Sequence, residues 1–433
     1  MKLLRASAVL LTMVVGIAAL SAQQPPTARP IQSLLGVGNG PAPPPAGADA
    51  FFDDSVLQEI RLNMNAKDWQ TLKDNYLDNT YYPTDFRWRD QTLRNVGIRS
   101  RGTGSRSGVK PGLRVDFDRY TSNQNFLGLK SFVLRNNTQD PSNMHERLSM
   151  QMFRRLGEPA SREAHVKLYI NDQYSGLFTI VESVDKTFLK RSFGEDSGYL
   201  YKYDYPIDGT PYRFEDKGSD PGLYVPLPFK PETHEDSPKP EFVAQLVQTV
   251  NQSSDATFRS AVGAYLDLSK FLRHVAVEVF VGDYDGFVGN YGINNFYFYR
   301  FDNQKTFVFI PWDKSEAFKA GPTSSVFHNI SDVPDSLKNR LMTRVLSYPD
   351  LYNQYLDSLI ACAQSAAELT SGDARGWLER EVQREYSQIQ DAAHADTEKP
   401  YSNDSFEAEI QLLLDFARRR SDIVTQEVNG ARR

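Results

Sequence analysis

The chain has 433 residues, of which 40% are hydrophobic and 24% are charged, and this ordinary globular composition excludes a wholly disordered chain and a collagen-like fibre. The formal net charge is -6, and the chain therefore lacks the excess of basic residues that is typical of nucleic-acid-binding proteins. Nucleic acid is not an expected partner. The single cysteine, Cys362, excludes an intramolecular disulfide and a cysteine-based zinc cluster. Stability must therefore come from packing.

The first 22 residues are typical of an export signal. Two basic residues, Lys2 and Arg5, precede the apolar run Ala6–Leu20, and two small residues follow it. The run is shorter than a comfortable membrane span, so we expect removal of the signal and no stable membrane insertion; an uncleaved anchor is the alternative. Residues 23–50 are rich in Pro, Ala and Gly and are predicted to be a linker. The expected location is the periplasm, the cell surface or the extracellular space.

Residues 51–205 are predicted to form a β-rich lobe with one helix. Alternating or short apolar runs predict strands at 59–63, 96–101, 113–117, 131–135, 166–170 and 177–182. The helix is predicted over 140–156, with Asp140 as its N-cap. Its apolar stripe recurs every four residues, at Met144, Leu148, Met152 and Leu156. Gly157 ends the pattern.

Residues 206–433 are predicted to form a mainly helical lobe after an irregular segment that reaches residue 240. The expected helices lie at 240–250, 255–263, 268–280, 338–345, 349–366, 374–393 and 404–428. One β-hairpin, 295–301 with 306–311, interrupts them. The predicted fold class is therefore α+β.

The segment Val281–Phe318 contains the residues most suited to catalysis. It places Asp285 in a Gly-rich loop after an apolar helix pattern, and Asp313 at the exit of the hairpin. Protein kinases use an Asp, an Asn five residues later, a hairpin and then a metal-binding Asp. Asp285 and Asn290 have this spacing, and Asp313 follows the hairpin. Because Asp and Asn commonly fill loops, simple turn formation is the alternative explanation.

Several motifs resemble the spore coat protein H (CotH) kinase family. Asn294–Arg300 reads NNFYFYR and Ile310–Asp313 reads IPWD, in the order found in that family. Further similar segments are Gly97–Gly102, Lys110–Asp118, His145–Arg147, Leu168–Asn171, Gly176–Phe178, Val181–Asp185 and Leu200–Lys202. The resemblance covers roughly residues 55–345, and the C-terminal helices carry no recognised motif.

This resemblance implies an exported atypical protein kinase with a divergent two-lobed kinase-like fold. Such an enzyme would transfer the ATP γ-phosphoryl group to Ser or Thr of a protein substrate, with Mg²⁺ or Mn²⁺. Asp285 would be the catalytic residue, Asp313 a metal ligand, and Glu146 the helix glutamate that orients a basic residue. The other residues implied to contact nucleotide or phosphate are Arg99, Arg101, Lys110, Arg114, Glu182 and Lys202. Without this resemblance, the simpler explanation is that these residues are surface charges or turn caps. Lys202 could then simply pair with Asp204.

We expect the buried Glu146 carboxylate to pair with Arg114, or else with Lys110, Arg99 or Arg101, because a buried carboxylate needs a partner. A guanidinium at Arg114 could bind the carboxylate and still present donors to phosphate.

The chain departs from the family pattern in three places. Arg114 replaces a lysine, Asn294 replaces a histidine, and Ser315 and Lys319 stand where Asp or Asn and Gly are usual. An insertion, Gly289–Ile293, makes the metal-binding asparagine ambiguous. Asn290 fits the kinase spacing and Asn295 fits the family pattern, and we prefer Asn295.

Two other functions remain open. A catalytically silent surface scaffold of the same fold is favoured by the departures at Arg114 and Ser315. A polysaccharide-binding or hydrolysing protein would use the aromatic residues as stacking platforms, but Asp283 and Asp285 lie too close in sequence for opposed carboxylates. Neither the phosphoacceptor nor the oligomeric state follows from the sequence.

Overall fold

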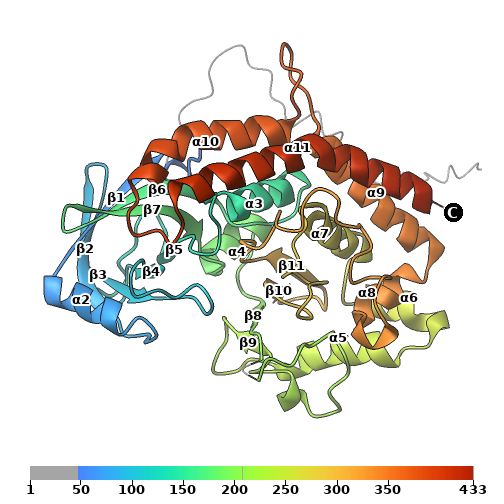
Figure 1. Cartoon of the computed structure of the whole chain (residues 1–433). Coiled ribbons are helices and arrows are strands. Elements are labelled where there is room, and N and C mark those ends of the chain that lie inside the picture. The colour runs from blue at the N-terminus through green and yellow to red at the C-terminus, as the bar shows by residue number, and fades with distance from the viewer. Residues whose placement is uncertain (1–46, 207, 433) are drawn as a thin grey trace, which may run out of the picture. The chain divides into compact units, whose positions relative to one another are not determined.

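Seven strands close into a barrel in the order β1-β2-β3-β4-β5-β7-β6, in a computed structural model that describes residues 47–206 and 208–432 (Figure 1). The barrel strands are β1 (Gln58–Met64), β2 (Tyr82–Trp88), β3 (Gln91–Ser100), β4 (Leu113–Asp116), β5 (Ser131–Arg135), β6 (Glu163–Ile170) and β7 (Gln173–Glu182). Neighbouring strands are antiparallel, except for the parallel pair of β1 and β6. The β6–β7 hairpin turns at Asn171 and Asp172, which both adopt positive φ, as this tight turn requires.

The two-residue period of the strands divides their side chains between the barrel interior and its outer face. Apolar residues of β3, β4 and β5 fill the interior, among them Ile98, Val115 and Leu134. The residues between them must point outward, and several of these are arginines: Arg99 on β3, Arg114 on β4 and Arg135 on β5, with Arg101 directly after β3.

A second sheet of four strands, ordered β11-β10-β8-β9, packs against the outer face of the barrel. Its strands are β8 (Tyr199–Tyr203), β9 (Phe229–Pro231), β10 (Phe296–Arg300) and β11 (Phe307–Pro311). Tyr297 and Ile310 on one face pack with Val133 of the barrel's outer face. The other face, which includes Phe298 and Phe309, joins the large core of the helices. This sheet brings the barrel arginines and the end of β11 together.

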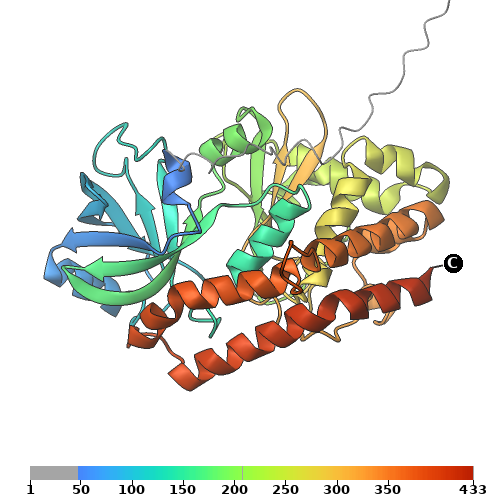
Figure 2. The ribbon, with the colours of Figure 1, turned by 90° about the horizontal axis from the view of Figure 1, so that it is seen from above.

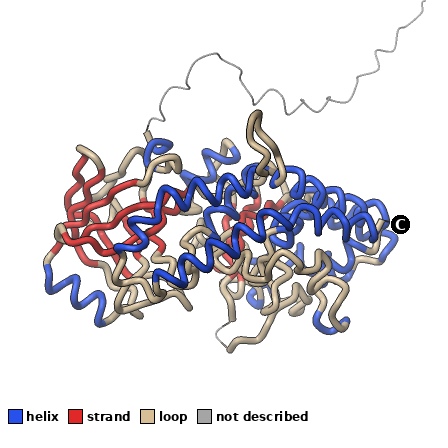
Figure 3. The backbone as a smooth tube through the Cα atoms, turned by 45° about the horizontal axis from the view of Figure 1, so that its top comes forward, coloured by secondary structure: helices blue, strands red, loops and turns tan. Residues whose placement is uncertain are grey.

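Eleven α-helices lie within the described residues, and several of them pack around the core (Figures 1 and 3). They are α1 (Ala48–Phe51), α2 (Ala66–Asp74), α3 (His145–Arg155), α4 (Lys186–Phe193), α5 (Pro240–Gln252), α6 (Asp255–Gly263), α7 (Leu268–Phe280), α8 (Arg340–Leu346), α9 (Pro349–Ala366), α10 (Trp377–Ala395) and α11 (Asn403–Ala431). Short 3₁₀ turns occur at Pro221–Leu223 and Asp335–Leu337. Helices α10 and α11 run side by side (Figure 2). No helix in the described part of the chain is both long and apolar enough to cross a bilayer.

The sequence-based predictions of the long elements are confirmed, one helix begins later than predicted, and several short elements were not predicted. Helices were expected at 255–263, 268–280 and 349–366, and the structure has them with these bounds. Helix α3 begins at His145 rather than near residue 140, because the Asp140 carboxylate caps the preceding turn by accepting from Ser142 N–H and His145 N–H.

The predicted β-rich lobe with a single helix is wrong in detail. Residues 51–205 also contain α2 and α4, and β8 pairs with β10 across the expected boundary at residue 205. Helix α2 escaped prediction because only Leu72 of its nine residues is buried. The expected linker ends earlier than residue 50, since α1 begins at Ala48; the predicted signal and residues 23–46 lie outside the described residues.

Candidate functional site

The candidate site lies where the outer face of the barrel meets the second sheet. Val133 and Val181 of the barrel pack against Tyr297, Ile310 and Trp312, so the strand ends that carry the predicted residues are held together. The site residues come from β3, β5, α3, the loop after α7 and the segment after β11.

A buried ion cluster fixes the loop that carries Asp285. The Lys314 ammonium lies 2.5 Å from Glu278 Oε1 and 2.9 Å from Asp283 Oδ2, and all three side chains are inaccessible to solvent. Glu278 Oε2 also accepts from Phe287 N–H, and Asp283 Oδ1 accepts from Asp285 N–H. Lys314 therefore ties the end of α7 and the loop to the segment that follows β11. The sequence offered no signal for this role, because lysines are rarely buried.

The Asp285 carboxylate is held between two asparagines. Asn294 Nδ2 donates to Oδ1 at 2.9 Å, and Asn295 Nδ2 donates to Oδ2 at 2.8 Å. Burial raises the pKa of Asp285 to about 6, and the hydrogen bond from Asn294 opposes this shift. A carboxylate with a pKa near neutrality, fixed by neutral donors, is suited to exchange a proton at physiological pH.

The two candidate asparagines have different surroundings. Asn295 directs its amide group to Asp285, and its backbone carbonyl accepts from Trp312 N–H at 3.0 Å. The side-chain oxygen of Asn290 instead accepts from His328 and Asn329. The Asn290 oxygen is thus occupied, whereas Asn295 links the Asp285 loop to the residue that precedes Asp313.

Asp313 follows β11 with a positive φ of 52°, which turns its carboxylate toward the barrel. Arg135 Nη1 donates to its Oδ1 at 2.6 Å, and Ser315 Oγ donates to the same oxygen at 3.2 Å. Burial would raise the pKa of Asp313, but the charges of Arg135 and Arg101 outweigh it and hold this pKa below its ordinary value. Asp313 therefore stays ionised, and no hydrogen bond from the described residues occupies its Oδ2.

Glu146 is buried and paired as expected, but with a different arginine. Its carboxylate forms an ion pair with Arg135, and the expected pairing with Arg114, Lys110, Arg99 or Arg101 is wrong. Arg135 thus bridges Glu146 on α3 and Asp313 after β11. Arg135 is the last residue of a predicted strand, and a charge that ends an apolar run was the only sequence signal for this role.

A second buried carboxylate adds to the charge around this arginine. Glu163 is the buried first residue of β6, and neither of its carboxylate oxygens is hydrogen-bonded among the described residues. Burial raises the pKa of Glu163 to about 7, and the nearby charge of Arg135 opposes this shift. Burial also raises the pKa of Glu146, again against the charge of Arg135.

Arg101 places a second guanidinium beside Trp312, next to that of Arg135. Its guanidinium lies 5.8 Å from the centre of the Trp312 ring, and Arg135 lies at the same distance from that ring. Burial lowers the pKa of Arg101 to about 10, and the charge of Arg135 lowers it further. No carboxylate among the described residues lies within 4.0 Å of the Arg101 guanidinium, so its donors remain available to a ligand.

Three other predicted basic residues make contacts of different kinds. Lys202 on β8 is paired in register with Tyr297 and contacts Asp204 at 2.8 Å, which was the alternative reading of this lysine. Arg114 donates to Ser131 Oγ at 3.1 Å. Arg99 reaches outward to Asn79.

Two predicted site residues are placed elsewhere by the structure. Lys110 is buried, with its ammonium 2.6 Å from Asp396 at the end of α10 and 2.8 Å from the Leu177 carbonyl. Glu182 is buried and binds Arg162 and Arg191. Both charges are neutralised by internal partners, so neither side chain is available to a nucleotide.

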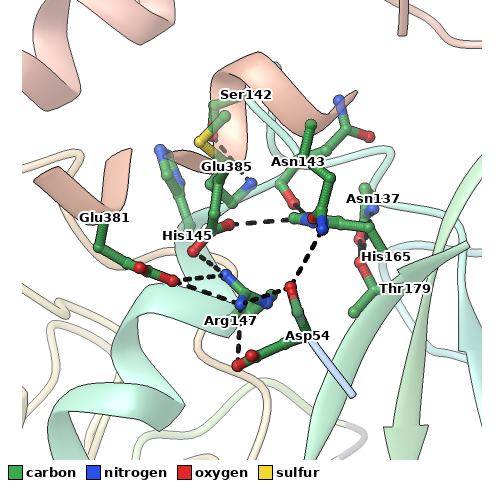
Figure 4. A network of polar contacts seen from close by, with 12 residues as sticks. Asp54, Asn137, Ser142, Asn143, His145, Arg147, His165, Thr179, Glu381 and Glu385 are labelled. Atoms are coloured by element: carbon green, nitrogen blue, oxygen red, sulfur yellow. Dashed lines mark hydrogen bonds and ion pairs between the residues drawn. The ribbon is translucent and has the colours of Figure 1, made fainter. Parts of the chain in front are cut away.

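A polar network around Arg147 connects helix α3 to α10 (Figure 4). The Arg147 guanidinium contacts Asp54 at 2.8 Å, Glu381 at 3.2 Å and the buried Glu385, the last two on α10. His165 approaches Glu385 at 3.9 Å. The C-terminal helices therefore help to set the position of Glu146, which is the neighbour of Arg147 on α3.

The residues fit a divalent cation that is held partly by a substrate. The described residues contain no group of three or more His, Cys, Asp or Glu side chains that could hold a metal ion alone. Mg²⁺ is commonly bound by one or two carboxylates together with substrate phosphates and water. The side-chain oxygens of Asp313 and Asn295 would be its protein ligands.

Comparison with known proteins agrees with the motifs. The sequence profile described as "CotH kinase protein" matches residues 98–424. The inner spore coat protein H of Bacillus subtilis is 24% identical over 383 residues, which cover 87% of this chain and 99% of that protein. Invasin CotH7 of Rhizopus delemar is 24% identical over 182 residues, which cover 41% of this chain and 29% of that protein.

A solved structure, that of the Helicobacter pylori proinflammatory kinase CtkA, aligns with 69% of this chain and 91% of its own. Its TM-score is 0.25 and its sequence identity is 11%, values too low to support an argument about the fold. The CotH kinase protein profile, by contrast, spans well over half of the chain. The chain therefore belongs to the CotH kinase protein family.

Proposed function

We propose that this protein is an exported kinase that transfers the γ-phosphoryl group of ATP to a Ser or Thr hydroxyl of a protein substrate. The observation that carries the proposal is the meeting of Asp285, Asn295 and Asp313 beside the unpaired Arg101 guanidinium. A proton acceptor, free oxygen ligands and an available cation are the groups that phosphoryl transfer needs.

In the proposed reaction, Asp285 orients the acceptor hydroxyl and accepts its proton as the oxygen attacks the γ-phosphorus. The new O–P bond forms while the bond between the γ-phosphorus and the β,γ-bridging oxygen breaks, and ADP leaves. Asn294 and Asn295 keep the Asp285 carboxylate in place. Arg101 and Arg135 would offset negative charge on the phosphates. A divalent cation, when bound to Asp313 and Asn295, would neutralise further phosphate charge.

An extracytoplasmic location is part of this proposal. It is supported by the signal-like sequence of residues 1–22 and by the names of the relatives, which are a spore coat protein and an invasin. The second candidate, a silent scaffold, is favoured by the ion pair between Arg135 and Asp313, which already satisfies one oxygen of the proposed metal ligand.

The test measures Mg²⁺-dependent ATP binding by calorimetry and phosphoryl transfer with labelled ATP. We expect Asp285→Asn to lower transfer by about 10²–10⁴-fold with little change in ATP affinity, because it removes only the proton acceptor. Asp313→Asn should weaken Mg²⁺-dependent ATP binding. Asp302→Asn, at the exposed turn of the same hairpin, should change neither quantity. Absence of Mg²⁺-dependent ATP binding by the unaltered chain would favour the scaffold.

A further inference from the structure

A cavity of about 450 Å³ lies along β11, the edge strand of the second sheet. Phe307, Val308 and Phe309 of β11 line it, together with the ends of α3 and α4 and the first turns of α7. The volume falls within the range of about 300–1,000 Å³ that is typical of small-molecule sites. None of the residues predicted to bind nucleotide lines it.

The cavity contains positive charge that the protein does not neutralise. Arg154, Arg191 and Lys270 line it. Arg191 is neutralised by Glu182, but no carboxylate of the described residues lies within 4.0 Å of the Arg154 guanidinium, whose one hydrogen bond goes to the Ser161 carbonyl. Burial lowers the pKa of Arg154, against the charges of Glu163 and Asp54, neither of which lies within ion-pair distance.

The acidic residues of the cavity are occupied or buried. The Asp267 carboxylate caps α7 by accepting from Ser269 N–H and Lys270 N–H. Glu158 lies 3.6 Å from the Arg273 guanidinium, and burial raises the pKa of Glu158. The cation left for a ligand is therefore Arg154, with Lys270 at the exposed rim.

The remaining walls are aromatic. Phe193, Phe271, Phe307 and Phe309 all line the cavity, and they offer apolar surface next to the cations. A ligand that satisfies both features carries one anionic group for Arg154 and an apolar or aromatic body for the phenylalanines. We propose that this cavity is a binding site for a small organic anion with an apolar body, separate from the proposed nucleotide site.

His274 connects the cavity to the ion cluster that holds the Asp285 loop. His274 lines the cavity, is almost fully buried, and its Nδ1 has no hydrogen-bond partner among the described residues. Its Nε2 lies 3.5 Å from Glu278 Oε1, which contacts Lys314, and Lys314 contacts Asp283. A ligand that hydrogen-bonds His274 would thus act on the ion cluster that holds Asp285. This coupling rests on the proposed function, whereas the binding site does not.

The experiment uses 2-naphthylacetate as the anionic probe and 2-naphthylacetamide as its uncharged counterpart, with binding measured by calorimetry on the whole chain. We expect the anion to bind at least 10-fold more tightly than the amide, because only the anion can pair with Arg154. Equal affinities of the two probes, or binding of neither, would overturn the proposal.

Two substitutions locate the site. Ser192 lines the cavity and is half-buried, so Ser192→Trp should fill the space and weaken anion binding at least 10-fold without disturbing the core. Lys270→Gln should weaken it about 3-fold, whereas Lys190→Gln, an exposed lysine of α4 outside the cavity, should leave it unchanged. Unchanged affinity in Ser192→Trp would place the bound probe elsewhere and would refute the assignment.

The coupling is measured as the change in Mg²⁺–ATP affinity when 2-naphthylacetate is saturating. By linkage, the probe and ATP must change each other's affinity by the same factor, and we expect a change of at least 3-fold that Ser192→Trp abolishes. A chain that binds the probe but no ATP would refute the kinase proposal and leave the anion site standing. ATP binding that the probe does not alter would refute the coupling.

Discussion

Arg135 is the counter-ion of the two main acidic side chains of the candidate site. It binds Glu146 and Asp313 at once, and all of its donors lie in a region almost closed to solvent. Removing one partner of a buried ion pair usually costs more than the pair contributes, because the other charge is left unpaired in a poorly solvated place. The nearby Arg114, which was the expected partner of Glu146, makes one hydrogen bond, to Ser131.

The first prediction compares these two arginines. We expect Arg135→Met to lower the free energy of unfolding by about 3–5 kcal/mol, because Glu146 loses its counter-ion. Arg114→Met, which removes an equally long charged side chain from a half-buried position, should cost about 1 kcal/mol or less. Urea unfolding measures both changes. Equal costs in the two variants would mean that Arg135 does not hold the site together.

The second prediction concerns the proton affinity of Asp285. The proposed phosphoryl transfer requires the ionised form of Asp285, so we expect kcat/KM to rise with pH through the Asp285 pKa of about 6. Asn294→Ala removes a hydrogen bond that stabilises the ionised carboxylate, so the rising limb should move to higher pH. Asn290→Ala does not touch Asp285 and should leave the limb in place. A limb that stays fixed in Asn294→Ala would argue that Asp285 is not the titrating group.

At the scale of elements, α10 and α11 hold α3 and the barrel. Arg147 on α3 contacts Glu381 and Glu385 on α10, and His145 on α3 lies 3.1 Å from Glu409 on α11. Asp396, which directly follows α10, accepts from Leu177 N–H on β7 and pairs with Lys110. The two helices without a recognised motif therefore position the helix that carries Glu146.

The third prediction tests this link through Asp396. Asp396→Asn leaves the buried Lys110 ammonium without a counter-ion, so we expect a loss of about 3–5 kcal/mol in the free energy of unfolding. Hydrogen exchange should increase at the end of α10 and in the first residues of β7, while α7 should change least. Asp391→Asn, an exposed position on the same helix, is the matched control and should cost less than about 0.5 kcal/mol. Protection that is lost evenly over the whole chain would contradict a local clamp.

For the described part of the molecule as a whole, buried ion clusters cross-link the barrel, the second sheet and the helices. Their carboxyl groups make stability depend on pH. Burial raises the pKa of Glu385 to about 8, against the charge of Arg147. A carboxyl group that binds its proton more tightly when folded stabilises the fold fully below its unfolded pKa of about 4.5, and this contribution is lost as the pH rises through about 8.

The fourth prediction follows from the direction of this pH dependence of stability. Glu385→Gln removes the titrating group, so the stability of the unaltered chain should fall relative to the variant between about pH 5 and 8. The slope of this difference should not exceed about 1.4 kcal/mol per pH unit, the limit for one proton. Urea unfolding at a series of pH values measures it. A difference that is flat, or that grows in favour of the unaltered chain, would show that Glu385 is ionised throughout.

The sequence alone determined the elements whose formation depends on local patterning. Helical apolar patterns located α7 and α9, a short apolar run located β5, and the family motifs located Asp285, Asn295 and Asp313. These features depend on neighbours along the chain, where side-chain spacing directly reflects helix or strand geometry.

Only the tertiary structure decided which charges are available to a ligand. Lys110 and Arg101 lie on either side of the segment Gly102–Val109, yet Lys110 is neutralised by Asp396, 286 residues away. Arg101 lies beside Trp312, with no carboxylate of the described residues within ion-pair distance. The partner of Glu146 was likewise settled by the packing of β5 against α3. A buried charge requires a counter-ion, but its identity depends on contacts between distant segments, and periodicity in one sequence contains no information about them.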